Sequence, residues 1–279
     1  MRTILTASDF SKNGNNTVEY AASLAEVFNS RLIICHVNET FTQNIRISES
    51  AINTELLSEM RSNLELLKQK ILNKHPDLSI DCIVLTGSTS HETIKNYSEE
   101  NKIDLIVIGC TGTNVIERKL MGSTSSKLIL SSTIPLICIP EHTNYSPIKR
   151  IAFATDLRED NLSASHSIIT FAKQFQSEIS FLFIDKKDEI HTEEQISELT
   201  RKIREKVHYP KISGYIIQHI NLNKGINAFH KKHNIDLLVM LKHVDENSNI
   251  ALSKSNTVYV SEHTTLPLLV LRSGIISVI

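Results

Sequence analysis

Ile103-Asp104-Leu105-Ile106-Val107-Ile108-Gly109 is the most informative segment of this chain, an apolar run of strand length that ends on a glycine. Strands that are apolar along their whole length, without alternation, are typical of parallel sheets covered by helices on both faces. We therefore expect a buried strand at Asp104–Ile108. The glycine that follows it lets the backbone turn sharply at the carboxyl end of that strand.

The same pattern returns 132 residues later as Ile235-Asp236-Leu237-Leu238-Val239. Nearer the start of the chain, Thr3–Phe10 aligns with Arg150–Leu157 at a shift of 147 residues. The difference of 15 residues lies between these segments, where the first half carries a longer loop and helix. The chain is therefore a duplication of one unit of about 140 residues, which is too long for a short-period solenoid.

Each unit reads as alternating strands and helices. In the first unit we expect strands at Thr3–Thr6, Arg31–Val37, Ile80–Leu85, Asp104–Ile108 and Leu136–Ile139, and helices at Asn15–Asn29, Ser50–Leu72, His91–Asn101 and Ser123–Leu130. In the second unit we expect strands near 150–155, 179–184, 212–218, 236–241 and 268–271. The predicted fold is α/β, with two tandem doubly wound, Rossmann-like domains, 1–144 and 145–279, each a five-stranded parallel sheet with helices on both faces. The polar segment Glu141–Pro147 suits a boundary.

Composition excludes several classes of protein. The 279 residues suggest about two domains of roughly 150 residues. A formal net charge of -1 argues against a polybasic nucleic-acid surface or an acidic tail. The apolar runs are far shorter than the roughly 20 residues of a membrane helix, and no apolar segment precedes Asp9, so we expect neither a membrane protein nor a signal peptide. The four cysteines are widely spaced, which favours reduced core residues and a cytoplasmic location.

Glycine clusters where a ligand could bind. Only eight glycines occur in the chain, and three of them, Gly109, Gly112 and Gly122, lie close together. Gly122-Ser123-Thr124 opens a predicted helix, where free N–H groups favour an anion and neighbouring hydroxyls add donors. These residues point to phosphate binding without covalent chemistry. If Gly-x-x-Gly is considered alone, an ordinary strand–turn–helix connection capped by Ser123 stays open as an alternative.

The complete pattern G-x2-G-x9-G-[ST] resembles the nucleotide loop of the universal stress protein family. The opening segment Ile4–Ser11, with Asp9 after the first strand, also resembles that family, although many members have proline where this chain has Ala7. The resemblance covers nearly the whole chain as two copies in tandem.

The resemblance implies an ATP site in the first unit. It places Ala7, Ser8 and Asp9 on the adenosine side and the main chain of Val37 at the adenine edge. The residues that it places at ribose, phosphates and triphosphate are Gly109, Thr111, Gly112, Gly122, Ser123, Thr124 and Ser125. Arg118 and Lys119 lie in the same loop, and two interpretations stay open for them: their side chains contact the phosphates, or they are exposed to solvent. A divalent cation, Mg²⁺ or Mn²⁺, is expected on the phosphates, although no carboxylate cluster is dedicated to it.

The second unit departs from the pattern. The shift of 132 puts Leu241, Val244 and Lys254 where the three loop glycines stand, while Ser255 and Asp156 are retained. We expect one ATP per chain, bound in the first unit, with the second unit a structural or partner-binding half. Isolated family domains commonly pair through their last strands, so the resemblance implies an intrachain pseudo-dimer and leaves a homodimer open. The protein partner is not identified by the sequence.

Three functions remain open at this point. The first is an ATP-binding stress or regulatory protein with slow hydrolysis at most, the second a nucleotide-independent interaction protein, and the third an ATP-using enzyme. No Gly-x-Ser-x-Gly elbow, His-Glu-x-x-His or Walker-type loop is present, and no catalytic residue is assigned. His230 and His233 share a helix face, but a metal site needs three or four converging ligands.

Overall fold

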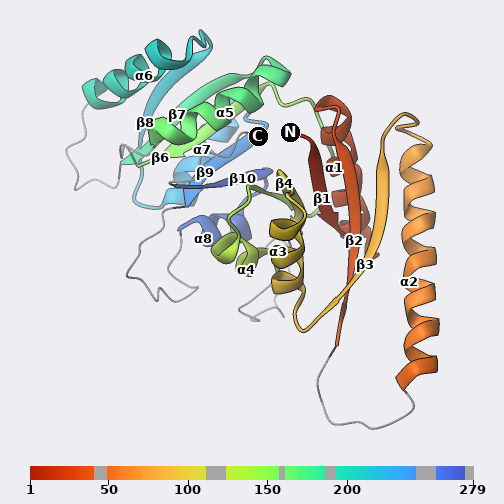
Figure 1. Ribbon diagram of the computed structural model, residues 1–279. Helices are drawn as coiled ribbons and strands as arrows, with labels where there is room; N and C mark the ends of the chain where they lie inside the picture. The colour runs from red at the N-terminus through yellow and green to blue at the C-terminus, as the bar shows by residue number, and fades with distance from the viewer. Residues whose placement is uncertain (41–48, 111–123, 157–160, 186–192, 243–255, 274–279) are drawn as a thin grey trace.

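The two units form one continuous sheet in the computed structural model, which describes residues 1–40, 49–110, 124–156, 161–185, 193–242 and 256–273 (Figure 1). The sheet has ten strands in the order β3-β2-β1-β4-β5-β10-β9-β6-β7-β8. Neighbouring strands are parallel within each unit, and β5 and β10 join the units as an antiparallel pair. The family resemblance implies this pairing through the last strand of each unit.

The elements follow the predicted order. The first unit contains β1 (Thr3–Ala7), α1 (Lys12–Val27), β2 (Arg31–Glu39), α2 (Glu49–Leu72), β3 (Ile80–Gly87), α3 (Ser90–Glu100), β4 (Leu105–Cys110), α4 (Thr124–Ser131) and β5 (Leu136–Pro140). The second contains β6 (Arg150–Thr155), α5 (Asn161–Phe175), β7 (Glu178–Asp185), α6 (Glu193–Val207), β8 (Ile212–Gln218), α7 (Leu222–His233), β9 (Leu237–Lys242), α8 (Asn256–His263) and β10 (Leu268–Arg272). The predicted α/β class with tandem doubly wound units is confirmed. Helix α1 begins three residues before its predicted start, because the Ser11 hydroxyl accepts a hydrogen bond from Gly14 N at 3.0 Å.

Helices cover both faces of the sheet, and each face carries a core that runs through both units. Helices α1, α2, α5 and α6 pack on one face, and α3, α4, α7 and α8 on the other. On the first face Phe28, directly after α1, contacts Phe171 and Phe175 of α5, with ring centroids 5.1 and 5.6 Å apart. Because both cores are shared between the units, the division into domains 1–144 and 145–279 stays a prediction.

The link between the units is packed against the first of them. Asn16 Nδ2 donates to the Thr143 carbonyl at 2.7 Å, and the Tyr145 ring lies edge-on to buried Tyr20 with centroids 5.2 Å apart. Residues 141–147 are polar, as a boundary requires, but they are held to α1 by these contacts. Among the described residues, no helix has both the length and the hydropathy needed to cross a membrane.

The amino-end edge of the sheet is built twice from the same hydrogen bonds. Asp104 accepts from Arg2 N and Thr3 N at 2.6 and 2.9 Å, and Asp236 accepts from Lys149 N and Arg150 N at 2.9 and 2.8 Å. Both aspartates are therefore structural residues at strand starts. Each carboxylate satisfies main-chain donors that would otherwise be unpaired where two neighbouring strands begin.

Candidate nucleotide site

The predicted site residues meet at the point where the strand order of the first unit reverses. Strand β1 lies between β2 and β4, and connections leave its carboxyl end on one face and that of β4 on the other. Ligands of doubly wound sheets bind at such switch points, beyond the carboxyl ends of the strands. The described residues Ala7, Ser8, Asp9, Val37 and Gly109 all lie at this edge.

The rest of the predicted site is partly outside the described residues. Thr124 and Ser125 open helix α4, Thr124 half-buried and Ser125 only 5% exposed. Thr111, Gly112, Gly122 and Ser123 lie outside the described residues, as do Arg118 and Lys119.

The turn after β1 presents Asp9 at the surface. The Ser8 hydroxyl accepts from Phe10 N at 3.0 Å, and Asp9 Oδ1 accepts from Ser11 N at 3.0 Å. Phe10 has φ of 62°, a left-handed conformation that non-glycine residues adopt rarely. A Cβ at Gly14 would overlap Asp9 Oδ1, so a glycine in the first turn of α1 is needed to fit this turn. The local bonds therefore fix the backbone at Asp9 while its side chain remains exposed.

A ring pair borders this turn. The imidazole of His36 stacks on Phe10 with centroids 4.5 Å apart, and its Nδ1 donates to the Ser8 carbonyl at 2.8 Å. The neighbouring Cys35 is fully buried on the opposite face, where burial raises the pKa of its thiol to about 12. Cys35 and His36 are therefore not a nucleophile–base pair, because their side chains lie on opposite faces of the strand. Sequence reasoning missed the structural role of His36, because Phe10 and His36 are distant in sequence.

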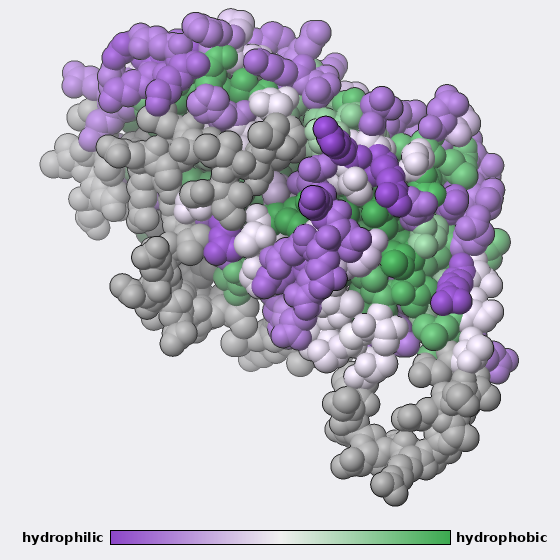
Figure 2. Space-filling model, in the orientation of Figure 1, coloured by the Kyte–Doolittle hydropathy of each residue, from purple (hydrophilic) through white to green (hydrophobic). Residues whose placement is uncertain are grey.

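An apolar surface lies next to the same edge. Ala7 and Val37 are half-buried and pack against the core of the α3–α4 face. Figure 2 shows hydrophobic residues over β2 and β3, between α3 and α2, and Ile83 of β3 is half-buried there. A flat apolar ring could pack on such a surface while main-chain groups of the strand ends supply its hydrogen bonds.

Gly109 is a glycine because helix α1 approaches it closely. A Cβ at this position would lie 2.8 Å from Thr17 Oγ1 and 3.3 Å from Asn13 Nδ2. Asn13 Oδ1 and Thr6 Oγ1 are buried, and neither has a hydrogen-bond partner among the described residues. Asn13 is a second residue that sequence reasoning missed, although the polar run Asn13–Asn16 at the start of the predicted helix signals it.

On the α3–α4 face, the two helices that begin near this edge differ in charge. At α3, Glu39 Oε1 accepts from Ser90 N and Ser90 Oγ at 2.6 Å, and these bonds lower the pKa of Glu39. Glu92 adds a second carboxylate in the first turn of α3, whereas the first turn of α4 holds no acidic residue. The amino end of α3 is therefore already neutralised by the chain, and that of α4 is the one suited to a phosphate.

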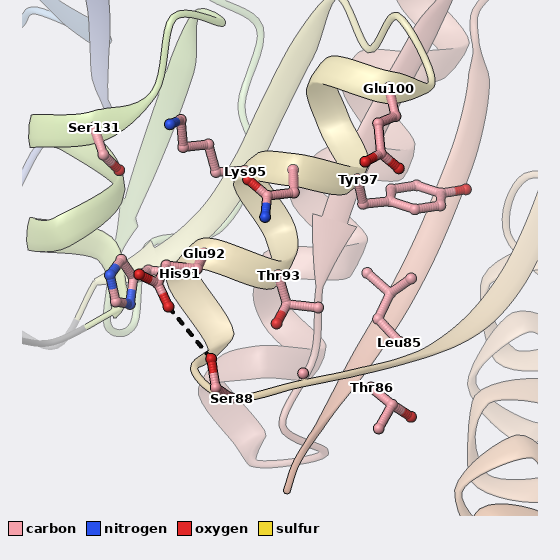
Figure 3. A pocket seen from close by; sticks show the side chains of 12 residues that line it. Leu85, Thr86, Ser88, His91, Glu92, Thr93, Lys95, Tyr97, Glu100 and Ser131 are labelled. Carbon is pink, nitrogen blue, oxygen red and sulfur yellow. Dashed lines mark hydrogen bonds between the residues drawn. The ribbon is translucent and has the colours of Figure 1, made fainter.

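A pocket of about 550 Å³ runs along α3 (Figure 3). Its lining residues lie on both sides of the helix, with Lys95 and His91 of α3 toward α4 and Tyr97 of α3 on the side of β3, which carries Leu85, and they do not converge on one point (Figure 3). Burial and the charge of Lys127 lower the pKa of His91, so this imidazole is neutral at pH 7. With carboxylates at its helix end and no converging donors, this pocket is a weaker candidate than the β1–β4 edge.

Histidines and cysteines do not form a metal centre in the part of the chain that the structure describes, where no group of three possible ligands occurs. His233 stacks on Phe229 with centroids 4.2 Å apart, and burial lowers its pKa. A hydrogen bond with Cys110 and burial raise the pKa of Cys138, and both cysteines are buried in the core.

The corresponding edge of the second unit is filled by side chains. Leu241, at the position of Gly109, is 7% exposed and belongs to the core of the α5–α6 face. Helix α5 carries Ala164 where α1 carries Thr17, which leaves space for the larger leucine. Asp156 is exposed, like Asp9. Val244, Lys254 and Ser255 lie outside the described residues.

Comparisons with known proteins agree with this architecture. The model of the universal stress protein family matches residues 1–140. Universal stress protein YxiE of Bacillus subtilis is 27% identical over 146 residues, 49% of this chain and 97% of the relative. Universal stress protein MJ0531 of Methanocaldococcus jannaschii is 32% identical over 88 residues, 30% of this chain and 51% of the relative.

One solved structure extends the likeness to both units. A universal stress protein from Archaeoglobus fulgidus superimposes with a TM-score of 0.77 at 16% identity, over 98% of this chain and 96% of the other. At that identity the likeness concerns the fold alone, and it shows that the ten-stranded tandem arrangement occurs in another protein. With a family model that matches half of its length, the chain belongs to the universal stress protein family.

Proposed function

We propose that the first unit binds ATP at the edge between β1 and β4, and that the chain acts as a nucleotide-responsive regulatory protein of the stress response. The observation that carries the proposal is a convergence at one switch point. Exposed Asp9 follows β1, Gly109 lies in the last two residues of β4 against α1, and the neighbouring helix α4 begins without an acidic residue. Open α/β sheets bind nucleotides at such edges.

Each group has a distinct part in this proposal. Asp9, with Ala7 and Ser8, borders the adenosine, and the main chain of Val37 meets the adenine edge. Gly109, Thr111 and Gly112 border the ribose and phosphates. The triphosphate is held at the start of α4 by Gly122, Ser123, Thr124 and Ser125, with Thr124 the more accessible of the two described hydroxyls. A bound Mg²⁺ or Mn²⁺ would neutralise phosphate charge and be held mainly by the phosphates and water.

We expect one nucleotide per chain. At the position of Gly109, which α1 approaches so closely that a Cβ would meet Thr17, the second unit carries the buried side chain of Leu241, so it lacks this close approach. We also expect slow turnover. Fast phosphoryl transfer needs a residue that orients the attacking group and further cations on the phosphates, and the described part of the site offers neither. Steady-state hydrolysis below about 1 s⁻¹, the low end of ordinary enzymes, is the expected result.

The test is calorimetric titration of nucleotide-stripped protein with ATP and Mg²⁺, using a matched pair of variants. Asp9→Asn removes the carboxylate of the first unit and Asp156→Asn its counterpart in the second. We expect a stoichiometry near one, at least tenfold weaker binding for Asp9→Asn, and unchanged binding for Asp156→Asn. Gly122→Val should abolish binding while leaving the protein folded, because its side chain would enter the space of the phosphates.

Two outcomes would contradict the proposal in different ways. A stoichiometry near two would mean that the second unit also binds ATP. A folded wild-type protein that gives no heat with ATP would favour the alternative, a nucleotide-independent interaction protein of the same fold.

A further inference from the structure

The position of helix α4 depends on what packs around it. The helix spans only Thr124–Ser131, and isolated helices of two turns are unstable in water. It packs against α3 in its own unit and against α8 in the second unit. Since the proposed phosphate site lies at its amino end, the residues that hold α4 in place also set the geometry of that site.

Two polar side chains of the second unit reach α4. Lys242, the last residue of β9, donates a hydrogen bond from Nζ to the Leu130 carbonyl in the last turn of α4. Glu262 of α8 accepts through Oε1 from the Ser126 hydroxyl at 2.9 Å. The last carbonyls of a helix have no partner within it, and a cation beside them also interacts favourably with the helix dipole.

Among the described residues, the corresponding positions lack the polar side chains that such contacts need in the opposite direction. At the shift of 132 residues, Lys242 corresponds to Cys110, which is 4% exposed and part of the core. Glu262 corresponds to Leu130, an apolar residue that cannot accept a side-chain hydrogen bond from α8. The position of Ser126 corresponds to buried Val258. The second unit therefore holds α4 with two polar side chains, whereas the positions that correspond to Lys242, Glu262 and Ser126 carry cysteine, leucine and valine.

Among the described neighbours of Lys242, the carbonyl end of α4 is the one that attracts its ammonium group. Arg272 of β10 is its direct neighbour in register and repels it. No ion pair joins Lys242 to a carboxylate among the residues that the structure describes. An ammonium group in such a place gains most from the carbonyl oxygens at the end of α4.

We infer that Lys242 and Glu262 are positioning residues for the nucleotide site, through which the second unit holds α4 in the orientation that its amino end needs to bind phosphate. This inference rests on the proposed function for its ligand. It gives the unit without a nucleotide loop a defined part in the affinity of the other unit.

The test compares Lys242→Met with Lys232→Met, which removes an exposed lysine from α7. The first readout is amide hydrogen exchange of the full chain without nucleotide. We expect the amides of α4 to exchange about tenfold faster in Lys242→Met, as for the loss of one hydrogen bond to a charged group, and those of α8 to be unchanged. Glu262→Leu should give a smaller change in the same helix.

The second readout is ATP affinity by calorimetry. We expect about tenfold weaker binding for Lys242→Met, no change for Lys232→Met, and recovery with Lys242→Arg, whose guanidinium can also donate to the Leu130 carbonyl. Equal acceleration in α4 and α8, or none in α4, would overturn the inference even if ATP binds. If wild-type protein does not bind ATP, the proposed function fails, while the exchange experiment still decides whether Lys242 holds α4.

Discussion

The two edges of this duplicated sheet have diverged to different degrees. At the amino-end edge the bonds are the same in both units, down to the Ser30 hydroxyl that donates to the Met1 carbonyl at 3.2 Å and the Ser177 hydroxyl that donates to Ile148 at 2.5 Å. At the carboxyl-end edge the residues differ: Gly109 of the first unit corresponds to Leu241 of the second, and Cys110 corresponds to Lys242.

This difference separates the needs of the fold from those of the site. Main-chain groups at the start of a strand must be paired in either unit, whatever that unit binds. A close backbone approach at the other edge is useful only where a ligand sits, and without one a larger side chain gains free energy by filling the space. The retained edge thus reports the scaffold, and under the proposed function the altered edge distinguishes the unit that binds nucleotide from the unit that does not.

The largest effect is expected when the buried side chain of Leu241 is removed from the carboxyl-end edge of the second unit. Leu241→Ala should lower the free energy of unfolding by about 3 kcal/mol, the usual range for a buried leucine being about 2–5 kcal/mol. Urea denaturation measures this change. The variant should not acquire a second ATP site, because the rest of the loop pattern is absent. A cost below about 1 kcal/mol would show that Leu241 does not fill a packed core.

The complementary change adds a side chain at Gly109 in the first unit. In Gly109→Ala the new Cβ would lie 2.8 Å from Thr17 Oγ1, whose hydroxyl donates to the Asn13 carbonyl at 2.9 Å. We expect a loss of about 1–3 kcal/mol in stability, as for overpacking, together with weaker ATP binding. Gly109→Ala combined with Thr17→Ala imitates the pair Leu241 and Ala164 and should recover most of the stability. Failure to recover it would mean that α1 is not what excludes a side chain at this position.

The lysine at the altered edge predicts a dependence on pH. Burial and Arg272 lower the pKa of Lys242 to about 8 from an ordinary value of 10.5, even though it donates to a carbonyl. The unfolded chain then binds more protons than the folded chain between these values, so stability rises with pH from about 8 to 10.5. Relative to Lys242→Met, the wild type should gain about 1 kcal/mol over this window once solvent screening of a half-buried amine is allowed for. Parallel stability curves for the two proteins would contradict the shift.

The smallest effect concerns a backbone feature that both units retain. Asn29 and Gln176, 147 residues apart, have φ of 49° and 54° and are both exposed. Gln176→Gly should raise the free energy of unfolding by about 0.5–1 kcal/mol, since glycine adopts this conformation without steric cost. Asn29→Gly should gain less, because asparagine enters the left-handed region more easily. Thermal unfolding of both variants compares them, and an equal gain would show that the side chains differ in some other contact.

Much of this architecture follows from local sequence. The strands were predictable because they are short continuous apolar runs, and the helices because apolar residues recur at helical spacing between them. Where α1 begins could be placed only by its cap, because Ser11 and Gly14 bond across the first turn. The contacts of Asn13 and His36 could not be predicted, since each meets a partner on another element.

By itself, the sequence determined the duplication, the order of the elements, the α/β class and the unit that keeps the glycine pattern, because periodicity and short motifs depend on neighbouring residues alone. Only the tertiary structure decided the register in which β5 and β10 pair, which faces share a core and which side chains meet at the seam. Lys242 and Leu130 are 112 residues apart, and they come together only because β5 and β10 pair antiparallel in one register. Such contacts depend on strand pairing over long separations, which no local pattern encodes.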